Sequence, residues 1–344
     1  MTHRLTCHNN QTRKSYDITD LAGSVQHVTS LSSQPGKLTF TLRSQPEKSI
    51  GGYESSEPLL ANGSMITFEK DGKGVFLGYI FSMTADASGT CKVTSYDQLR
   101  YLKNEDTEPI TPMTASDAFE KICNKHGILR TIKTPSRSLT PAHYHDKKSL
   151  YSMMEYHIMW ANTQERKQFF VKDDFGVLTF TELAAHKTNI VIGDGSLLSA
   201  YQYEISIDKD TYNVVKLYRE NGSTGRVDAW VEMDSANQAR WGKLQLLERV
   251  NDDMNEAQIK ELANRLLTLK NRQTRTMRLS VIAAGSEIGL PKDLTLADAS
   301  LLVAGSGFRL RLEKLGIEED IWIEEAAHNY TRDVHTISME VFMP

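Results

Sequence analysis

Leu59-Leu60-Ala61-Asn62-Gly63-Ser64 and Leu301-Leu302-Val303-Ala304-Gly305-Ser306 are two copies of one pattern, LL-x-x-GS, that lie about 240 residues apart. Each copy is followed by a first strand and then by a strand, a polar turn and another strand. The last two strands are expected at 75–83 and 90–95 in the first copy, and at 321–327 and 336–342 in the second. The sequence therefore predicts that one β-unit occurs twice in the chain.

The spacing of the two copies supports this prediction. From Glu69 onward they keep a constant offset of 244 residues, which is an even number. Since strand side chains alternate between two faces, an even offset places corresponding residues on the same face. Chance is the alternative, because the string is short and any all-β chain contains hairpins. The residues expected to share a face are Val75, Leu77, Tyr79 and Val93 in the first copy and Ile321, Ile323, Ile337 and Met339 in the second.

Composition indicates a folded protein of two or three domains, with 344 residues, 40% hydrophobic and 24% charged. A net charge of −4 gives no electrostatic reason to bind nucleic acid or an anionic membrane. Cys7, Cys91 and Cys123 are far apart and form no CxxC, so they indicate neither a zinc site nor a disulfide framework. The first residues lack a signal peptide, and no apolar stretch is long enough to span a membrane, so we expect synthesis in a bacterial cytoplasm.

The patterns predict a mainly β protein with α+β insertions. Residues 1–105 form the first β-barrel, in which 37–43 alternates apolar and polar side chains. Residues 106–189 form a small α/β module with helices near 114–127 and 149–161 and a hairpin over 168–181.

The second β-barrel is predicted over 190–235 and 272–344, and a helical insertion over 236–271 interrupts it. Within the barrel, 214–219 and 226–232 are expected to pair. Asn255 and Gln258 can cap the helix of the insertion.

A search for chemistry finds no metalloprotease, Walker, dinucleotide or nucleophile-elbow motif. The best metal-like cluster is His143-Tyr144-His145-Asp146, but no third ligand is identifiable and a polar loop explains it better. His328 and His335 flank the last turn and are interpreted as a surface pair, with a pH switch as the alternative.

Other candidate residues have ordinary explanations. Met153-Met154 and Met159-Trp160 are interpreted as core, and Glu318-Glu319-Asp320 as protection of a strand edge. Cys123 and His126 are the only close nucleophile–base pair. The sequence therefore assigns no catalytic, cofactor or metal residue and no interface residue. The basic run, expected on a solvated face or a protein interface, is Arg265, Lys270, Arg272, Arg275 and Arg278.

Three segments carry a resemblance to a known family. They are the barrel end from Gly78-Tyr79-Ile80 through Thr94-Ser95-Tyr96-Asp97 to Leu102, the helix that begins Asn255-Glu256-Ala257-Gln258, and the terminal Glu325-Ala326-Ala327-His328-Asn329-Tyr330. In this order they resemble the hub proteins of contractile phage tails. The likeness is greatest to the XkdQ/YqbQ-type family of prophages, which is related to the late control protein D family and the T4 baseplate hub.

The resemblance implies a structural function without enzyme activity or cofactor. Such hubs are homotrimers whose two tube-type barrels per chain make a pseudo-sixfold ring. The ring would join a hexameric tail tube to a trimeric spike in a virion or tail-like particle. The implied partners are the tube, spike, tape measure and other baseplate proteins, with no membrane and no specific nucleic acid, DNA only passing through the lumen. The alternatives are a tail-tip cell-wall hydrolase and a glycan- or receptor-binding tail protein.

Overall fold

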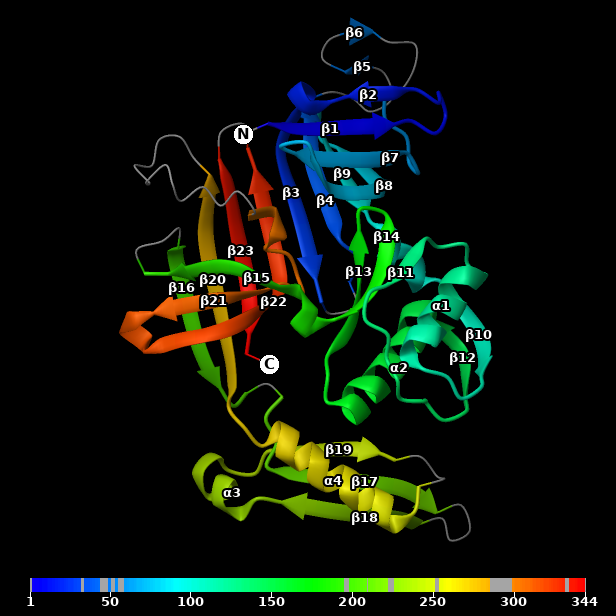
Figure 1. The fold of residues 1–344 in the computed structure, drawn as a ribbon, viewed down its shortest axis with the longest axis vertical. Coiled ribbons are helices and arrows are strands. Elements are labelled where there is room, and N and C mark those ends of the chain that lie inside the picture. The colour runs from blue at the N-terminus through cyan, green and yellow to red at the C-terminus, as the bar shows by residue number, and fades with distance from the viewer. Residues whose placement is uncertain are drawn as a thin grey trace. The chain divides into compact units, whose positions relative to one another are not determined.

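The computed structural model divides the chain into two compact units. It describes residues 2–31, 34–43, 49–50, 53–54, 59–194, 198–208, 210–221, 226–250, 254–284, 299–331 and 334–343. The larger unit combines Met1–Tyr201 with Arg278–Pro344, and the smaller unit is Gln202–Met277. Strands predominate in both (Figure 1).

A 13-stranded sheet dominates the larger unit. Its strands follow the order β16-β20-β23-β22-β3-β4-β9-β8-β7-β1-β2. Strand β21 is outside this order and pairs with both β15 and β22. The C-terminal strand β22 thus lies between β23 and the N-terminal strand β3 (Figure 1). The bounds are β1 His3–His8, β2 Ser15–Asp17, β3 Ala22–Ser30, β4 Lys37–Arg43, β7 Met65–Lys70, β8 Lys73–Ala85, β9 Thr90–Tyr96, β15 Lys187–Gly193, β16 Leu198–Ser206, β20 Thr274–Ala284, β21 Gly307–Leu312, β22 Ile317–Tyr330 and β23 His335–Phe342.

The prediction of a mainly β protein is confirmed, whereas two separate closed barrels are not seen. Among the described strands, neither predicted barrel has the pairing between its first and last strands that would close it. The physical reason lies in β22, which is long enough to serve both halves. Its first part pairs with β21, and its last part, Glu325 to Tyr330, pairs with β3.

The two LL-x-x-GS strings fold alike. Gly63 and Gly305 both have positive φ, 80° and 86°, which a residue with a side chain rarely adopts. Each string then makes the same two backbone bonds to the second strand of the hairpin that follows it. The bonds are Gly63 N–H to the Ile80 carbonyl (2.7 Å) and Ile80 N–H to the Ser64 carbonyl (2.9 Å), matched by Gly305 N–H to the Ile323 carbonyl (2.9 Å) and Ile323 N–H to the Ser306 carbonyl (3.0 Å).

The predicted face of β8 is wrong. Phe76 and Ile80 are buried, not their odd-numbered neighbours, whereas Ile321 and Ile323 are buried as expected. Since Ile80 corresponds to Ile323, the offset at this strand is odd. Both copies carry a register shift directly after this isoleucine, which returns the following strand to the predicted face. Val93, Ile337 and Met339 are accordingly buried.

The core of the N-terminal strands includes one residue from the other end of the chain. The alternation of β4 buries Leu38, Phe40 and Leu42 as predicted. Tyr330 of β22 is buried in the same cluster. The C-terminal strand is therefore part of the N-terminal core.

The two helices and the hairpin expected within 106–189 are present. Thr114 and Ser149 each accept a backbone N–H and begin the two helices, as expected for N-cap residues. The hairpin of β13 and β14 also pairs with β11, in parallel. The bounds are β10 Glu105–Ile110, α1 Ala115–Lys125, β11 Arg130–Ile132, β12 His143–Ser149, α2 Leu150–Glu165, β13 Phe169–Asp174 and β14 Val177–Glu182, with short helices η1 Thr19–Leu21, η2 Gln98–Lys103, η3 Leu183–His186, η5 Ala299–Leu301 and η6 Glu313–Leu315 and a short pair β5 Ser49–Ile50 and β6 Tyr53–Glu54.

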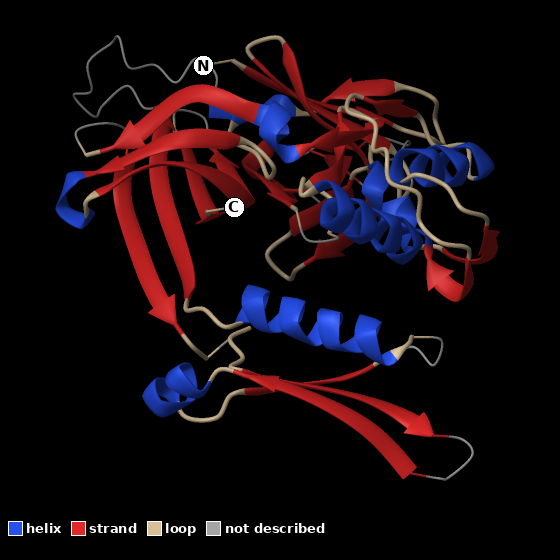
Figure 2. Ribbon diagram, turned by 60° about the horizontal axis from the view of Figure 1, so that its bottom comes forward, coloured by secondary structure: helices blue, strands red, loops and turns tan. Residues whose placement is uncertain are grey.

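The smaller unit is a three-stranded sheet with a helix on one face (Figure 2). Strand β17 (Val214–Asn221) pairs with β18 (Arg226–Met233) and with β19 (Gln245–Arg249). Asn255 and Gln258 form a complete capping box at the start of α4 (Glu256–Lys270), and α3 spans Ser235–Trp241. The expected insertion covered only 236–271, but the unit also contains β17 and β18, because α4 packs on Val215 and Leu217. The turn at Gly222 lies outside the described residues.

Candidate functional site

The most concentrated group of buried polar side chains lies where β22 meets β3. We name it the β3–β22 joint, and its members come from four strands that are far apart in sequence. All are at most 7% exposed. They are His27 of β3, Lys70 of β7, His328 and Tyr330 of β22, and His335 of β23.

Hydrogen bonds connect Lys70, His335 and His328 in a chain that ends at the carbonyl oxygen of Leu302. Lys70 Nζ lies 3.2 Å from Nδ1 of His335, and Nε2 of His335 lies 3.0 Å from Nδ1 of His328. Nε2 of His328 lies 2.8 Å from the carbonyl oxygen of Leu302. The interpretation of His328 and His335 as surface residues is therefore wrong, although they do face each other.

Burial keeps the histidines of the joint neutral. It lowers the pKa of His27 to about 3, that of His328 to about 4 and that of His335 to about 2. The charge of Lys70 acts in the same direction on His328 and His335. Burial also lowers the pKa of Lys70, and the nearby carboxylate of Asp71 opposes that shift.

A pocket of about 680 Å³ lies beside the joint in the larger unit. The ends of β3 and β9, the start of β8, strand β13 and residues 300–306 line it. Two aspartates on this lining are held by backbone N–H groups. Asp97 accepts from Gly36 (2.8 Å) and Leu99 (3.0 Å), and Asp173 accepts from Gly176 (2.7 Å) and Gln98 (3.2 Å).

The two carboxyl groups of the pocket influence each other. Burial raises the pKa of Asp97 well above its usual value, and the charge of Asp173 raises it further. Burial also raises the pKa of Asp173 to about 6. Like charges that share a buried site cannot both ionise easily. The pair is therefore expected to hold a proton near neutral pH.

Asp173→Asn should make the protein less sensitive to alkali. A raised folded-state pKa gives stability that is complete below the unfolded value of 3.8 and is lost as pH rises through about 6. For Asp173 the whole loss is about 3 kcal/mol, of which about 1.4 kcal/mol falls between pH 5 and pH 8, and the variant should avoid it. Urea unfolding at pH 5 and pH 8 measures the difference.

Asp174→Asn is the matched control, since Asp174 is partly exposed and pairs with Lys133 at 3.0 Å. Carbon NMR of the carboxyl groups should also show a lower midpoint for Asp97 in Asp173→Asn. An unchanged midpoint would mean that the two groups do not interact.

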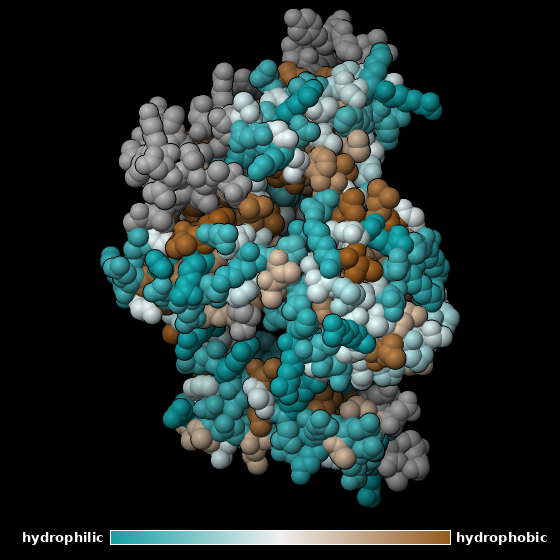
Figure 3. All heavy atoms as spheres, in the orientation of Figure 1, coloured by the Kyte–Doolittle hydropathy of each residue, from teal (hydrophilic) through white to brown (hydrophobic). Residues whose placement is uncertain are grey.

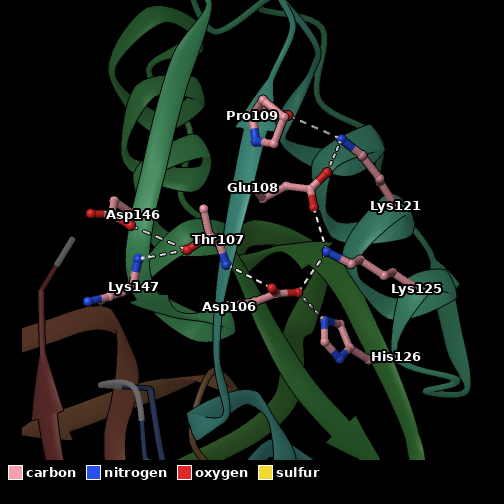
Figure 4. A network of polar contacts seen from close by, with 9 residues as sticks. All are labelled: Asp106, Thr107, Glu108, Pro109, Lys121, Lys125, His126, Asp146 and Lys147. Atoms are coloured by element: carbon pink, nitrogen blue, oxygen red, sulfur yellow. Dashed lines mark hydrogen bonds and ion pairs between the residues drawn. The ribbon is translucent and has the colours of Figure 1, made fainter.

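Charged residues also connect β10 to α1 (Figure 4). Lys125 bonds Asp106 and Glu108 at 2.7 Å each, Lys121 lies 2.5 Å from Glu108, and His126 lies 3.3 Å from Asp106. The lysines lower the pKa of both carboxyl groups. The side chains are partly exposed, so the network positions the strand on the helix with a modest energy.

The polar loop expected at His143-Tyr144-His145-Asp146 is wrong, because this segment belongs to the strand β12. His145 is buried, and its ring packs against those of Tyr156 (5.4 Å) and His157 (5.9 Å). Asp146 is exposed and accepts a bond from Thr107 at 3.4 Å (Figure 4). The two side chains lie on opposite faces of β12, because they are adjacent in a strand. Within the part of the chain that the structure describes, no group of three potential ligands occurs.

Cys123 and His126 lie in and after α1 without forming a catalytic pair. Burial raises the pKa of the Cys123 thiol to about 12, so the thiolate nucleophile is suppressed. His126 instead faces Asp106.

The remaining candidates are distributed among ordinary contacts. Met153 and Met154 are buried as predicted, but Met159 is 63% exposed. In the basic run, Lys270 bonds Asp210 at 2.6 Å and Arg278 bonds Glu340 at 3.3 Å. The acidic run lies in the part of β22 that pairs with β21. Glu318 and Asp320 pair with Arg311 and Arg309 across β21 and β22, at 3.0 and 3.3 Å.

The surface in Figure 3 is largely hydrophilic, and its hydrophobic residues form small separate groups. Such scattered groups are normal for folded proteins. None of the helices in the described ranges has the length and apolar character that a membrane span requires.

Sequence reasoning missed Lys70, Asp97 and Asp173. A signal for Asp97 was available, because an aspartate between a strand and a helical turn is a typical N-cap, and Asp97 caps η2. Lys70 carries no local signal, since its partner His335 is distant in sequence. Asp173 has a local partner in Gly176, but Asp97, which shares its pocket, is distant.

Comparison with known proteins is consistent across the chain. The model of the YQBQ-like family matches residues 25–342. The protein XkdQ of the phage-like element PBSX of Bacillus subtilis (strain 168) is 23% identical over 284 residues, which are 82% of each chain.

Two solved structures share the fold. The 43 kDa tail protein of prophage MuSo2 from Shewanella oneidensis has a TM-score of 0.69 and 14% identity, over 99% of this chain and 98% of that one. The E. coli c3393 protein has a TM-score of 0.50 and 9% identity, over 94% of this chain and 73% of that one. It is described as a component of the type VI secretion system with structural similarity to the T4 tail proteins gp27 and gp5.

Proposed function

This chain belongs to the YQBQ-like family, and we propose that it is a structural, non-enzymatic hub of a contractile tail or tail-like injection particle. The carrying observation is the shared fold over 99% of the chain with a prophage tail protein. In this proposal three copies form a pseudo-sixfold ring that joins the hexameric tail tube to the trimeric spike. Its other partners are the tape measure and baseplate proteins, and it works in the virion or particle after assembly in the bacterial cytoplasm.

The ring needs two similar β-domains in each chain, and the molecule offers support for this assignment. The first domain is residues 1–105, and the second contains β15, β16 and β20 to β23. The two LL-x-x-GS units make the same backbone bonds and have a register shift at the same point. Two β-domains in each of three chains give six positions, which suits a contact with a sixfold tube.

The two edge strands β15 and β16 are evidence for the proposed assembly with further copies. In the described pairings, β15 contacts only β21 and β16 only β20. An unpaired edge presents N–H and C=O groups to another chain. Asp194 N–H bonds the Arg311 carbonyl at 3.1 Å, so strand alternation directs the N–H of Val191 away from β21. Val191 is also 51% exposed.

Val191→Pro should weaken the trimer without unfolding the chain. Proline removes the outward N–H, and edge strands tolerate it. A lost hydrogen bond costs about 1 kcal/mol, so three interfaces lose about 3 kcal/mol, or about a hundredfold in assembly. Native mass spectrometry over a concentration series measures this. Val191→Thr, which keeps the N–H and the branched side chain, should assemble normally, and equal assembly of both variants would exclude β15 from the interface.

The hub proposal itself is tested by native mass measurement and negative-stain imaging of the protein, alone and with its tube protein. The expected particle is a six-lobed ring of three chains. A strict monomer at high concentration, even beside the tube protein, would overturn the proposal. A zymogram on cell wall should show no lysis, in agreement with the buried, protonated thiol of Cys123.

A further inference from the structure

The hydrogen-bond chain of the β3–β22 joint determines where its protons lie. The carbonyl of Leu302 can only accept, so Nε2 of His328 carries a proton. A neutral His328 then has an acceptor at Nδ1, which must receive the Nε2 proton of His335. Nδ1 of His335 is thereby an acceptor for Lys70. The complete chain of bonds is possible only while both rings are neutral.

Protonation of either ring breaks this order. A charged imidazole has a donor on both nitrogens. In His328 the new proton on Nδ1 would meet the N–H of His335, and in His335 the new proton on Nδ1 would meet the ammonium of Lys70. Both encounters place two donors face to face inside the protein, where a polar group without an acceptor is costly.

Among the described residues, no carboxylate acts on the histidine rings of the joint. The charged or titratable groups that act on these rings are Lys70 from β7 and the other histidines, including His27 from β3. Tyr330 of β22 places its hydroxyl 3.3 Å from Nδ1 of His328. The nearby carboxylate of Asp71 acts on Lys70 and accepts the N–H of Thr2 at 3.0 Å.

We propose that the Lys70–His335–His328 chain makes the β3–β22 joint acid-sensitive, closed while the rings are neutral and opened when they take up protons. Opening separates the β22–β23 hairpin from the N-terminal strands, because Lys70 belongs to β7 and the histidines to the hairpin. The inference concerns the joint within one chain, so it holds whether or not the chain forms a ring.

The direction of the pH effect follows from the lowered pKa values of the folded state. A group with a depressed pKa contributes stability that is complete above its unfolded value, 6.5 for histidine, and is lost as pH falls toward the folded value. Between pH 7 and pH 5, each such histidine increases the opening constant about 25-fold. His328 and His335 together therefore increase it about 600-fold.

The test is hydrogen exchange of the β22 and β23 amides at pH 7 and pH 5, corrected for intrinsic exchange. His335→Gln keeps a donor toward His328 and an acceptor toward Lys70 but does not titrate. Its acid-induced opening should be about 25-fold smaller than that of the wild type. The control is His8→Gln, because His8 is partly exposed and bonds Ser15 outside the joint. Equal acid responses of His335→Gln and the wild type would overturn the proposal.

A second measurement covers the case in which His335→Gln fails to fold. His328→Gln offers an amide donor to Leu302 and an acceptor to His335, and it should show the same reduced acid response. In the wild type, nitrogen NMR should find His328 protonated at Nε2 alone and not titrating between pH 7 and pH 5. Titration of both rings near 6.5 with the joint closed would overturn the proposal.

Discussion

Tyr330→Ala should destabilise the larger unit by about 4 kcal/mol. Tyr330 is 1% exposed and belongs to a C-terminal strand, yet its ring lies 4.9 Å from that of Phe68 and 4.2 Å from that of His335. Truncation would leave a cavity between β7, β22 and β23 and remove contacts that tie the two ends of the chain together. Urea unfolding at neutral pH measures the loss.

The matched control is Tyr330→Phe, which keeps the ring and removes only the hydroxyl. That hydroxyl makes one long bond, 3.3 Å, to His328, so we expect a loss of about 1 kcal/mol or less. If the alanine and phenylalanine variants were equally stable, packing at this position would not hold β22 in the N-terminal core.

Gly78→Val should destabilise the larger unit by at least about 3 kcal/mol. Gly78 does not have a positive φ. Glycine is required here because there is no space for a side chain. A Cβ atom here would lie 2.3 Å from the carbonyl oxygen of Tyr96 and 2.4 Å from the ring of Phe76. Neither neighbour can move freely, because Tyr96 is in the paired strand β9 and Phe76 is in the core. Soluble yield and thermal unfolding measure the effect.

Gly72→Ala separates crowding from backbone strain. Gly72 has a φ of 75°, and no described atom lies within 4 Å of a Cβ built there. Its replacement should cost about 1 kcal/mol, which is the price of a left-handed conformation alone. A Gly78 variant that lost no more than this would show that β8 and β9 can separate to admit a side chain.

Helix starts, strand faces and turns were predictable because each depends on residues that are close together in the sequence. Asn255 and Gln258 predicted the start of α4, and both halves of the capping box are present. The alternation in 37–43 predicted the buried face of β4. The repeat was visible in two short strings, whose glycines have the same positive φ for the same turn.

The buried face of β8 could not be predicted from the sequence pattern. The prediction applied the even offset of 244 residues to the whole of β8. At Ile80 and Ile323, however, the two copies are separated by an odd number of residues. The register shift after Ile80 and after Ile323 then restored the parity. A bulge adds a residue to one strand and leaves no fixed mark in the sequence.

The sequence by itself determined that this protein is mainly β, where its helices begin, and which family of tail proteins it resembles. Only the tertiary structure decided that β22 pairs with β3, that Tyr330 enters the N-terminal core, and that His335 meets Lys70 across 265 positions. Helix caps and strand alternation depend on neighbours within a few residues. Strand pairing depends on which edges meet, and burial depends on everything that packs around a residue, so neither is written in a local pattern.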